Sequence, residues 1–370
     1  MTKRVLIIGG YGNFGSYIAR RLAQNNNIKL IIAGRSKIKA ETFIASLETV
    51  HTALAVELDI HNNLDKSLAN LKPNIVIHTS GPFQGQGYDV AKSCIGAGCH
   101  YIDLADGREF VSTIEALDEA AEEAGVTIVS GASSVPCLSS CLIDHYGEEF
   151  SKLLSVDYGI TTAQRTNRGL ATTEAILSYV GKPIDTLVHG QLHSVYGWQN
   201  LYRHSFKALG IRYLANCDIP DLVLFPKRYP SLKTLRFQAG LELPLLHIGL
   251  WGLSWLVRLR LIKNLKNWAR WLLKTSFLFD PLGSDISAFY MRLRGKEACG
   301  EQKEILFDLT ARSGDGPYIP CMPAILITEK LVHGEEVPVG AMACIGLLTL
   351  DEYLDALEPL DISWTAISTP

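Results

Sequence analysis

The stretch RVLIIGGYGNFGSYIARRLAQ, residues 4–24, decides the fold. Its first five residues form a β-rich run, and its second half carries the apolar spacing of an amphipathic helix. Between the two stands a G-x-G-x-x-G pattern formed by Gly10, Gly12 and Gly15. In this position the pattern predicts a turn that holds the pyrophosphate of a dinucleotide at the N-terminus of a helix.

Each glycine of this turn has a separate physical task. Gly10 permits the tight turn, Gly12 lets the backbone approach the pyrophosphate, and Gly15 allows close packing of helix on sheet. The alternative is a purely structural glycine turn. The predicted cofactor-binding residues of this segment are Gly10, Tyr11, Gly12, Asn13, Phe14 and Gly15.

The next hundred residues repeat the alternation of strand and helix, which is typical of a parallel, doubly wound Rossmann sheet. The fold class is therefore α/β. The six β-rich runs lie at residues 4–8, 28–33, 52–58, 74–79, 100–104 and 126–130.

The end of the second run indicates which nicotinamide cofactor binds. Arg35 stands twenty residues after Gly15, where an NAD site would place an acidic residue. An arginine there, with Ser36 and Lys37 beside it, suits the 2′-phosphate of NADP. We expect NADP, with NAD as a second possibility, and the alternative is an ordinary solvated arginine.

Two further runs end in candidate cofactor contacts. Asp59 follows the third run, where a side chain can approach the adenine. Ser80, Gly81 and Pro82 follow the fourth, at the carboxyl edge of the sheet, where ligands of open α/β sheets bind.

Several motifs together resemble the saccharopine dehydrogenase-like NAD(P)-binding oxidoreductase family. That group includes saccharopine dehydrogenases and trans-acting enoyl reductases. The resemblance implies a nicotinamide-dependent oxidoreductase with a second α/β domain and a C-terminal segment packing back on the first. The motifs that carry it are GGYGNFG, AGRS, SGPF, AGCHYIDLADG (97–107) and GASSVPCLSS (131–140).

Candidate catalytic residues lie at the fifth run. Asp103 is placed near its end, close to the predicted crevice, and Tyr101 is a potential proton donor. The ordinary alternative is that both have structural roles.

In the second domain, Arg165, Arg168 and Thr172 form a loop entering a helix, with Thr172 or Thr173 as N-cap. Such a loop could bind an anionic substrate group, or could be a solvated basic loop.

Composition excludes other classes. A net charge of −3 gives no reason to expect nucleic acid as a partner. The eight cysteines form no C-x-x-C pair, so we expect reduced thiols and no metal site. The apolar run at the N-terminus is too short for a signal peptide, which favours the cytoplasm.

We divide the chain into a Rossmann domain (1–135), a second α/β domain (136–315) and a C-terminal segment (316–370). The second domain carries an apolar, basic helical insertion at about residues 241–279. From Trp255 to Lys274 its pattern predicts one amphipathic helix lying on a membrane surface. The alternative, commoner for a helix in an enzyme, is packing against the second domain or a partner subunit.

The sequence thus predicts an NADP(H)-dependent oxidoreductase acting on a small molecule. The substrate is either a lipid-like molecule with a C=C bond or an amino-acid-derived imine with a C=N bond. The alternative is a non-catalytic NADP(H)-binding scaffold or redox sensor, and peripheral membrane contact is one possibility left open by the insertion. We also expect a homodimer.

Overall fold

The structure is a computed structural model that describes residues 2–370. Its contacts divide the chain into two compact units. Unit 1 extends to Cys141 and also includes Tyr318–Ala356, and unit 2 comprises Leu142–Pro317 and Leu357–Pro370.

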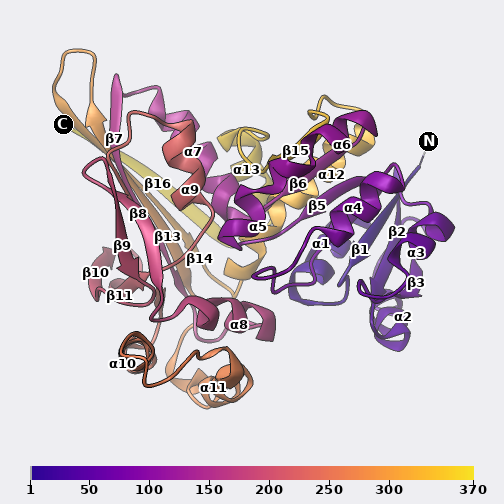
Figure 1. Ribbon diagram of the computed structural model, residues 1–370, viewed down its shortest axis with the longest axis horizontal. Helices are drawn as coiled ribbons and strands as arrows, with labels where there is room; N and C mark the ends of the chain where they lie inside the picture. Colours follow the sequence, from indigo (N-terminus) through magenta and orange to yellow (C-terminus); the bar gives the residue numbers. More distant parts are fainter. Residues whose placement is uncertain (1) are drawn as a thin grey trace. The chain divides into compact units, whose positions relative to one another are not determined.

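Unit 1 is built on a seven-stranded sheet with the order β15-β6-β5-β4-β1-β2-β3, in which every pair is parallel (Figure 1). This is the predicted doubly wound sheet, so the predicted fold class is confirmed. Its strands are β1 (Lys3–Ile8), β2 (Ile28–Gly34), β3 (Leu54–Glu57), β4 (Ile75–His78), β5 (His100–Asp103), β6 (Thr127–Ser130) and β15 (Gly340–Ala343). Its helices are α1 (Asn13–Leu22), α2 (Lys37–Ala45), α3 (Leu64–Leu71), α4 (Asp89–Gly96), α5 (Arg108–Ser112), α6 (Asp118–Glu123), α12 (Met322–His333) and α13 (Leu350–Leu357), and α7 (Ser139–Gly147) leads into unit 2.

The core of unit 1 explains why strand β1 contains a continuous apolar run. All four residues from Val5 to Ile8 are at most 1% exposed, because helices cover both faces of a parallel sheet. Leu68 of α3 and Ala91 of α4 belong to the same buried cluster as Leu6 and Ile8. The helices and the sheet therefore share one buried core.

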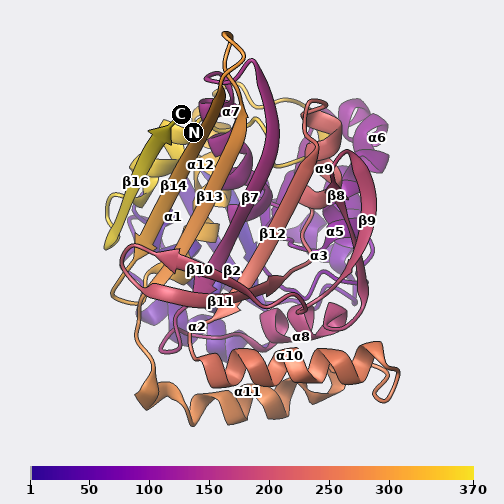
Figure 2. The same ribbon diagram turned by 90° about the vertical axis from the view of Figure 1, so that its left-hand side faces the viewer.

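Unit 2 contains a second seven-stranded sheet with the order β10-β11-β12-β7-β13-β14-β16. Only β12 and β7 pair in parallel, and the long strands lie side by side in Figure 2. The strands are β7 (Lys152–Thr162), β8 (Pro183–Val188), β9 (Gln191–Tyr196), β10 (Tyr202–Phe206), β11 (Gly210–Asn216), β12 (Thr234–Leu241), β13 (Ser287–Lys296), β14 (Gln302–Ala311) and β16 (Ile362–Thr369), with β8 and β9 forming a separate hairpin. The helices are α8 (Leu170–Tyr179), α9 (Asp221–Arg228), α10 (Pro244–Arg258) and α11 (Ala269–Phe277).

The C-terminal segment differs from the prediction. We expected residues 316–370 to pack back on the first domain as a whole. Residues 318–356 do belong to unit 1, where β15 pairs with β6. The last strand, β16, instead pairs with β14 in unit 2, because the free edge of β14 offers it an antiparallel partner from Ala311 to Glu304.

The insertion also differs from the prediction. The prediction of a single helix from Trp255 to Lys274 is wrong, since α10 already ends at Arg258 and Arg260 adopts a positive φ of 62°. A turn follows, then the short helical segment Lys266–Trp268, then α11. Periodicity alone missed this break because neither glycine nor proline marks it. None of the helices within residues 2–370 has the length and apolar character needed to cross a bilayer.

Packing of α10 on unit 2 generates a stability prediction. A Cβ at Gly181, whose φ is +73°, would lie 2.4 Å from the carbonyl oxygen of Ser254 and 2.7 Å from Cβ of Val257. Gly181→Ala should therefore lower the free energy of unfolding by about 2–4 kcal/mol, through strain and overpacking. Urea unfolding measures the effect.

Gly249→Ala is the matched control, because no atom lies within 4 Å of a Cβ built there and the residue is helical. This change should leave stability unchanged or raise it by up to about 1 kcal/mol. Equal stabilities of the two variants would contradict the close contact between Gly181 and α10.

Candidate functional site

The turn between β1 and α1 brings backbone against backbone. The N–H of Gly12 donates to the carbonyl oxygen of Gly9 at 2.8 Å, and the N–H of Ser16 donates to that of Gly12 at 2.9 Å. A Cβ at Gly15 would lie only 2.4 Å from the Gly9 oxygen, so helix and turn meet here only because Gly15 has no side chain. Gly12 is exposed, with a single atom within 4 Å of a Cβ built on it. The turn therefore offers open backbone at Gly12.

One glycine of the turn was missed by the pattern. The residue with a positive φ is Gly9, at +80°, and not Gly10, to which we assigned the tight turn. A Cβ at Gly9 would lie 2.7 Å from the hydroxyl oxygens of both Thr79 and Ser80. Gly9 thus also lets the loop after β4 approach the turn. The signal was present as the first G of GGYG, one position before the pattern begins.

The loop after β4 contains Ser80, Gly81 and Pro82. The hydroxyl of Thr79 donates to the carbonyl oxygen of Ile8 at 2.9 Å. Gln86 donates through Nε2 to the carbonyl oxygens of Ser80 at 3.1 Å and Pro82 at 2.7 Å. The loops after β1 and β4 are therefore tied together at the carboxyl edge of the sheet. Gln86 was not predicted, because nothing in its local sequence marks its reach back along the chain.

Tyr11, a predicted cofactor residue, covers the end of β2. A Cβ at Gly34 would lie 2.5–2.7 Å from its ring and hydroxyl, and the N–H of Ser36 donates to its hydroxyl at 3.1 Å. Ser36 also accepts, through Oγ, from the N–H of Lys39 at 3.4 Å and so caps α2. Gly34 was missed as a determinant, although it stands within the AGRS motif.

Arg35 is exposed directly after β2. Its side chain has no hydrogen bond or ion pair within residues 2–370. Asp59 instead serves its own turn, accepting from the N–H of His61 at 3.1 Å and from Asn62 at 2.8 Å. These hydrogen bonds, and more weakly the charge of Arg35, lower the pKa of the Asp59 carboxyl. The guanidinium group of Arg35 is therefore available to an anion.

The two predicted catalytic residues lie inside unit 1. Asp103 and Tyr101 are both fully buried. Oδ1 of Asp103 accepts from the N–H groups of Ala105 and Gly131, each at 2.9 Å, and from the hydroxyl of Ser130 at 3.0 Å. Asp103 therefore joins the segments that follow β5 and β6. Its direct contact with a substrate stays a prediction.

The surroundings of Asp103 set its charge. Burial raises the pKa of its carboxyl to about 6, although the hydrogen bonds oppose this shift. The hydroxyl of Tyr101 lies 3.1 Å from Nδ1 of His78, and burial lowers the pKa of His78 to about 4. At neutral pH this cluster therefore holds a carboxylate beside a neutral imidazole.

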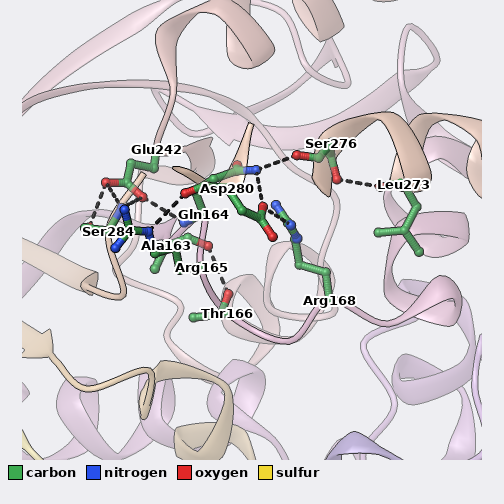
Figure 3. Close-up of polar contacts among 10 residues, drawn as sticks. All are labelled: Ala163, Gln164, Arg165, Thr166, Arg168, Glu242, Leu273, Ser276, Asp280 and Ser284. Atoms are coloured by element: carbon green, nitrogen blue, oxygen red, sulfur yellow. Dashed lines mark hydrogen bonds and ion pairs between the residues drawn. The ribbon is translucent and has the colours of Figure 1, made fainter. Parts of the chain in front are cut away.

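In unit 2, the loop with Arg165 and Arg168 binds a segment of the chain more than a hundred residues away (Figure 3). Arg165 donates to the carbonyl oxygens of Asp280 and Pro281, each at 3.0 Å. Arg168 pairs with the carboxylate of Asp280, and its guanidinium carbon lies 4.6 Å from the centre of the Phe277 ring. Both arginines thus hold the end of the helical insertion, and their binding of a substrate anion stays a prediction.

The predicted N-cap in this loop is wrong. The helix α8 begins at Leu170 with Gly169 as N-cap, so Thr172 lies within its first turn. The hydroxyl of Thr173 donates to the carbonyl oxygen of Gly169 at 3.0 Å instead of accepting from the helix N-terminus. Glycine in an extended conformation is itself a tolerated N-cap, which is why the threonines were not needed.

Comparisons with known proteins now bear on these findings. Residues 5–129 match the family model of the saccharopine dehydrogenase NADP binding domain. Saccharopine dehydrogenase-like oxidoreductases of Rattus norvegicus and Mus musculus are 27% and 28% identical to the chain over 150 and 151 residues. These matches cover 36% of this chain and 35% of each relative, so the chain spans about a third of the curated relatives' length.

A solved structure matches the whole chain. It is the apo saccharopine dehydrogenase (L-Glu forming) of Saccharomyces cerevisiae, with a TM-score of 0.67. The sequences are 15% identical, and the match covers 99% of this chain and 100% of the other. At this identity the similarity concerns the fold, including the seven-stranded sheet of unit 2.

A parallel doubly wound sheet with an open glycine turn after its first strand defines a dinucleotide-binding domain. Residues 5–129 resemble the saccharopine dehydrogenase NADP binding domain, whose family model they match. The resemblance inferred from its motifs, and NADP as the cofactor of the domain, are thereby confirmed.

The geometry of the glycine turn generates a prediction that separates binding from folding. Gly12→Val should abolish NADPH binding, because its side chain would occupy the open face of the turn, yet lower the thermal unfolding midpoint less than Gly15→Ala, since its Cβ would lie 3.1 Å from the Gly9 oxygen. Gly15→Ala is the comparison, since its Cβ would meet the Gly9 oxygen at 2.4 Å and so lower that midpoint. Fluorescence titration and thermal unfolding measure the two effects. Normal NADPH binding by Gly12→Val would contradict the assignment of the turn.

Asp103 generates a prediction about pH. The pKa of its carboxyl is about 6 in the folded protein, against an ordinary value of 3.8. Between these values the folded state binds a proton that the unfolded state does not, so this group's contribution to stability falls as pH rises. The shift corresponds to about 3 kcal/mol. Asp103→Asn lacks this titration, and urea unfolding of both proteins from pH 4 to 7 should show their difference changing by most of that amount. A constant difference would rule out the raised pKa.

Proposed function

We propose that this protein is an NADP(H)-dependent oxidoreductase that transfers a hydride to or from a small organic substrate. The observation that carries the proposal is the exposed Arg35, unpaired within residues 2–370, at the carboxyl end of β2 in a domain that matches NADP-binding domains. A guanidinium group in this position favours a 2′-phosphate over a 2′-hydroxyl.

The residues of unit 1 divide the work of holding the cofactor. The open backbone at Gly12 and the N-terminus of α1 would receive the pyrophosphate. Arg35 would receive the 2′-phosphate, and the loop with Ser80, Gly81 and Pro82 would lie along the nicotinamide half. Hydride chemistry is supplied by the nicotinamide when bound, and the protein supplies orientation and electrostatics.

The substrate carries either a C=C bond in a lipid-like molecule or a C=N bond in an amino-acid-derived imine. Both reactions take a hydride from NADPH and a proton from solvent or a protein group. Saccharopine dehydrogenase-like oxidoreductases among the relatives support an oxidoreductase.

A second function is a scaffold or redox sensor that binds NADP(H) without turnover. One observation favours it: Asp103 and Tyr101, the two predicted catalytic groups, are both fully buried and in contact with other protein groups. A panel of imine, enoyl and carbonyl compounds distinguishes the two functions. Oxidation of NADPH in the presence of any of them supports the enzyme, and tight NADPH binding without oxidation across the panel supports the scaffold.

The cofactor preference has its own test. Arg35→Ala should weaken NADPH binding by about 1–3 kcal/mol, or about 5- to 150-fold, because a charge-assisted contact is lost. NADH binding should not change. Calorimetric titration with both cofactors measures the four affinities.

Lys29→Ala serves as the control, since Lys29 is exposed at the start of the same strand. It changes the net charge equally but lies away from the carboxyl edge. Equal affinity of the wild type for NADPH and NADH, or equal effects of the two substitutions, would contradict the role of Arg35.

A further inference from the structure

The helical insertion, Leu243–Phe279, presents apolar side chains to solvent along one face of α10. The exposed residues follow the spacing of a helical face, and Gly249 and Gly252 between them have no atom within 4 Å of a built Cβ. Unit 2 covers this face only in part, since its large apolar side chains are 36–67% exposed. Its exposed side chains are Leu245, Ile248, Trp255, Leu256 and Leu259.

The second helical part of the insertion, residues 266–279, also exposes large apolar side chains. Trp268 is 44% exposed, Trp271 is 63% exposed and Leu278 is 78% exposed. Within residues 2–370, eleven of the twenty exposed large apolar side chains lie between Leu245 and Leu282. Such a concentration on one segment marks an interaction surface.

The charged side chains of this segment are all basic. Six arginines and lysines and no acidic residue occur between Leu243 and Phe279. Arg258 donates to Gln199 and stacks on Tyr196. The others have no side-chain hydrogen bond or ion pair within the described part of the chain; they are Arg260, Lys263, Lys266, Arg270 and Lys274.

Specific contacts hold the insertion in place on its inner side. His247, Ser254 and Val257 of α10 are buried, and Ser254 and Val257 meet Gly181. At the other end, Gln164 donates to the carbonyl oxygen of Ser276 at 2.8 Å (Figure 3). Both helices are displayed at the lower end of unit 2 in Figure 2. The apolar face therefore results from a defined conformation of a fixed segment.

We propose that the helical insertion binds the surface of a membrane that contains anionic phospholipid. Exposed tryptophans and leucines enter the boundary between headgroups and acyl chains, and the five unpaired cations contact lipid phosphates. At fifteen residues α10 lies along the surface and does not span the bilayer. A second copy of the chain fits less well, because two such cationic surfaces repel each other.

Vesicle flotation of the full-length protein at low salt is the test. Wild type should float with vesicles of phosphatidylcholine and phosphatidylglycerol and remain at the bottom with phosphatidylcholine alone. Brominated phosphatidylcholine, mixed with phosphatidylglycerol, should quench tryptophan fluorescence, since Trp255, Trp268 and Trp271 are exposed. Failure of the wild type to float with the anionic vesicles overturns the proposal.

Variants separate charge from apolar contact. Lys263→Glu/Lys266→Glu/Arg270→Glu and Trp271→Ser/Leu278→Ser should each reduce the vesicle partition coefficient at least tenfold. The control, Lys29→Glu/Lys66→Glu/Lys92→Glu, changes the net charge as much as the first variant, at exposed lysines of unit 1. Its partition should stay within twofold of wild type, and a loss equal to that of the first variant overturns the proposal.

Folding and self-association are read independently. NADPH affinity and the thermal midpoint, measured for every variant, should match the wild type, because the changed side chains are exposed and lie outside the cofactor turn. In sedimentation without lipid, the wild type should form no dimer through this surface. A dimer formed through it would be lost in Trp271→Ser/Leu278→Ser. Such a dimer, without vesicle binding, would assign this surface to a second copy. Absence of NADPH turnover would leave this proposal intact, because the two rest on different units.

Discussion

The backbone contact between Gly15 and Gly9 is the constraint on which unit 1 depends. Helix α1 can approach the end of β1 only where no Cβ intervenes, and a Cβ at Gly15 would be 2.4 Å from the Gly9 oxygen. The same approach directs the free N–H groups of α1 toward the carboxyl edge of the sheet. Close packing and the position of the helix N-terminus are thus two results of one missing side chain.

Local signals predicted unit 1 well. Its first six strands were identified from short β-rich runs. The clearest is β1, where Val5–Ile8 are all apolar because the strand is buried on both faces, whereas the edge strand β3 has exposed residues. The glycine turn was identified because its tasks require glycine at fixed spacing. Gly9 and Gly34 were not predicted, because each is required by a contact with a distant segment. Gly9 contacts the loop after β4, and Gly34 contacts the Tyr11 ring.

Unit 2 shows why the rest could not be predicted. Its sheet combines strands from residues 152 to 369, and no local pattern specifies that β16 pairs with β14. Arg165 and Arg168 looked like a free basic loop because their partner, Asp280, lies far along the chain. Asp103 was interpreted as a potential catalytic residue for the same reason, since its hydrogen bond with Gly131 becomes visible only when β5 and β6 are adjacent.

The passage of the chain between the two units affects how fragments of this protein can be made. Unit 1 needs Tyr318–Ala356 because β15 covers the edge of β6, and a fragment ending at Cys141 would leave that edge open to pair with other chains. During synthesis, too, the sheet of unit 1 is incomplete until β15 has left the ribosome, and the sheet of unit 2 is incomplete until β16 has done so. The Rossmann unit is therefore an assembly of two separate segments, and producing it alone requires joining them through a linker that replaces unit 2.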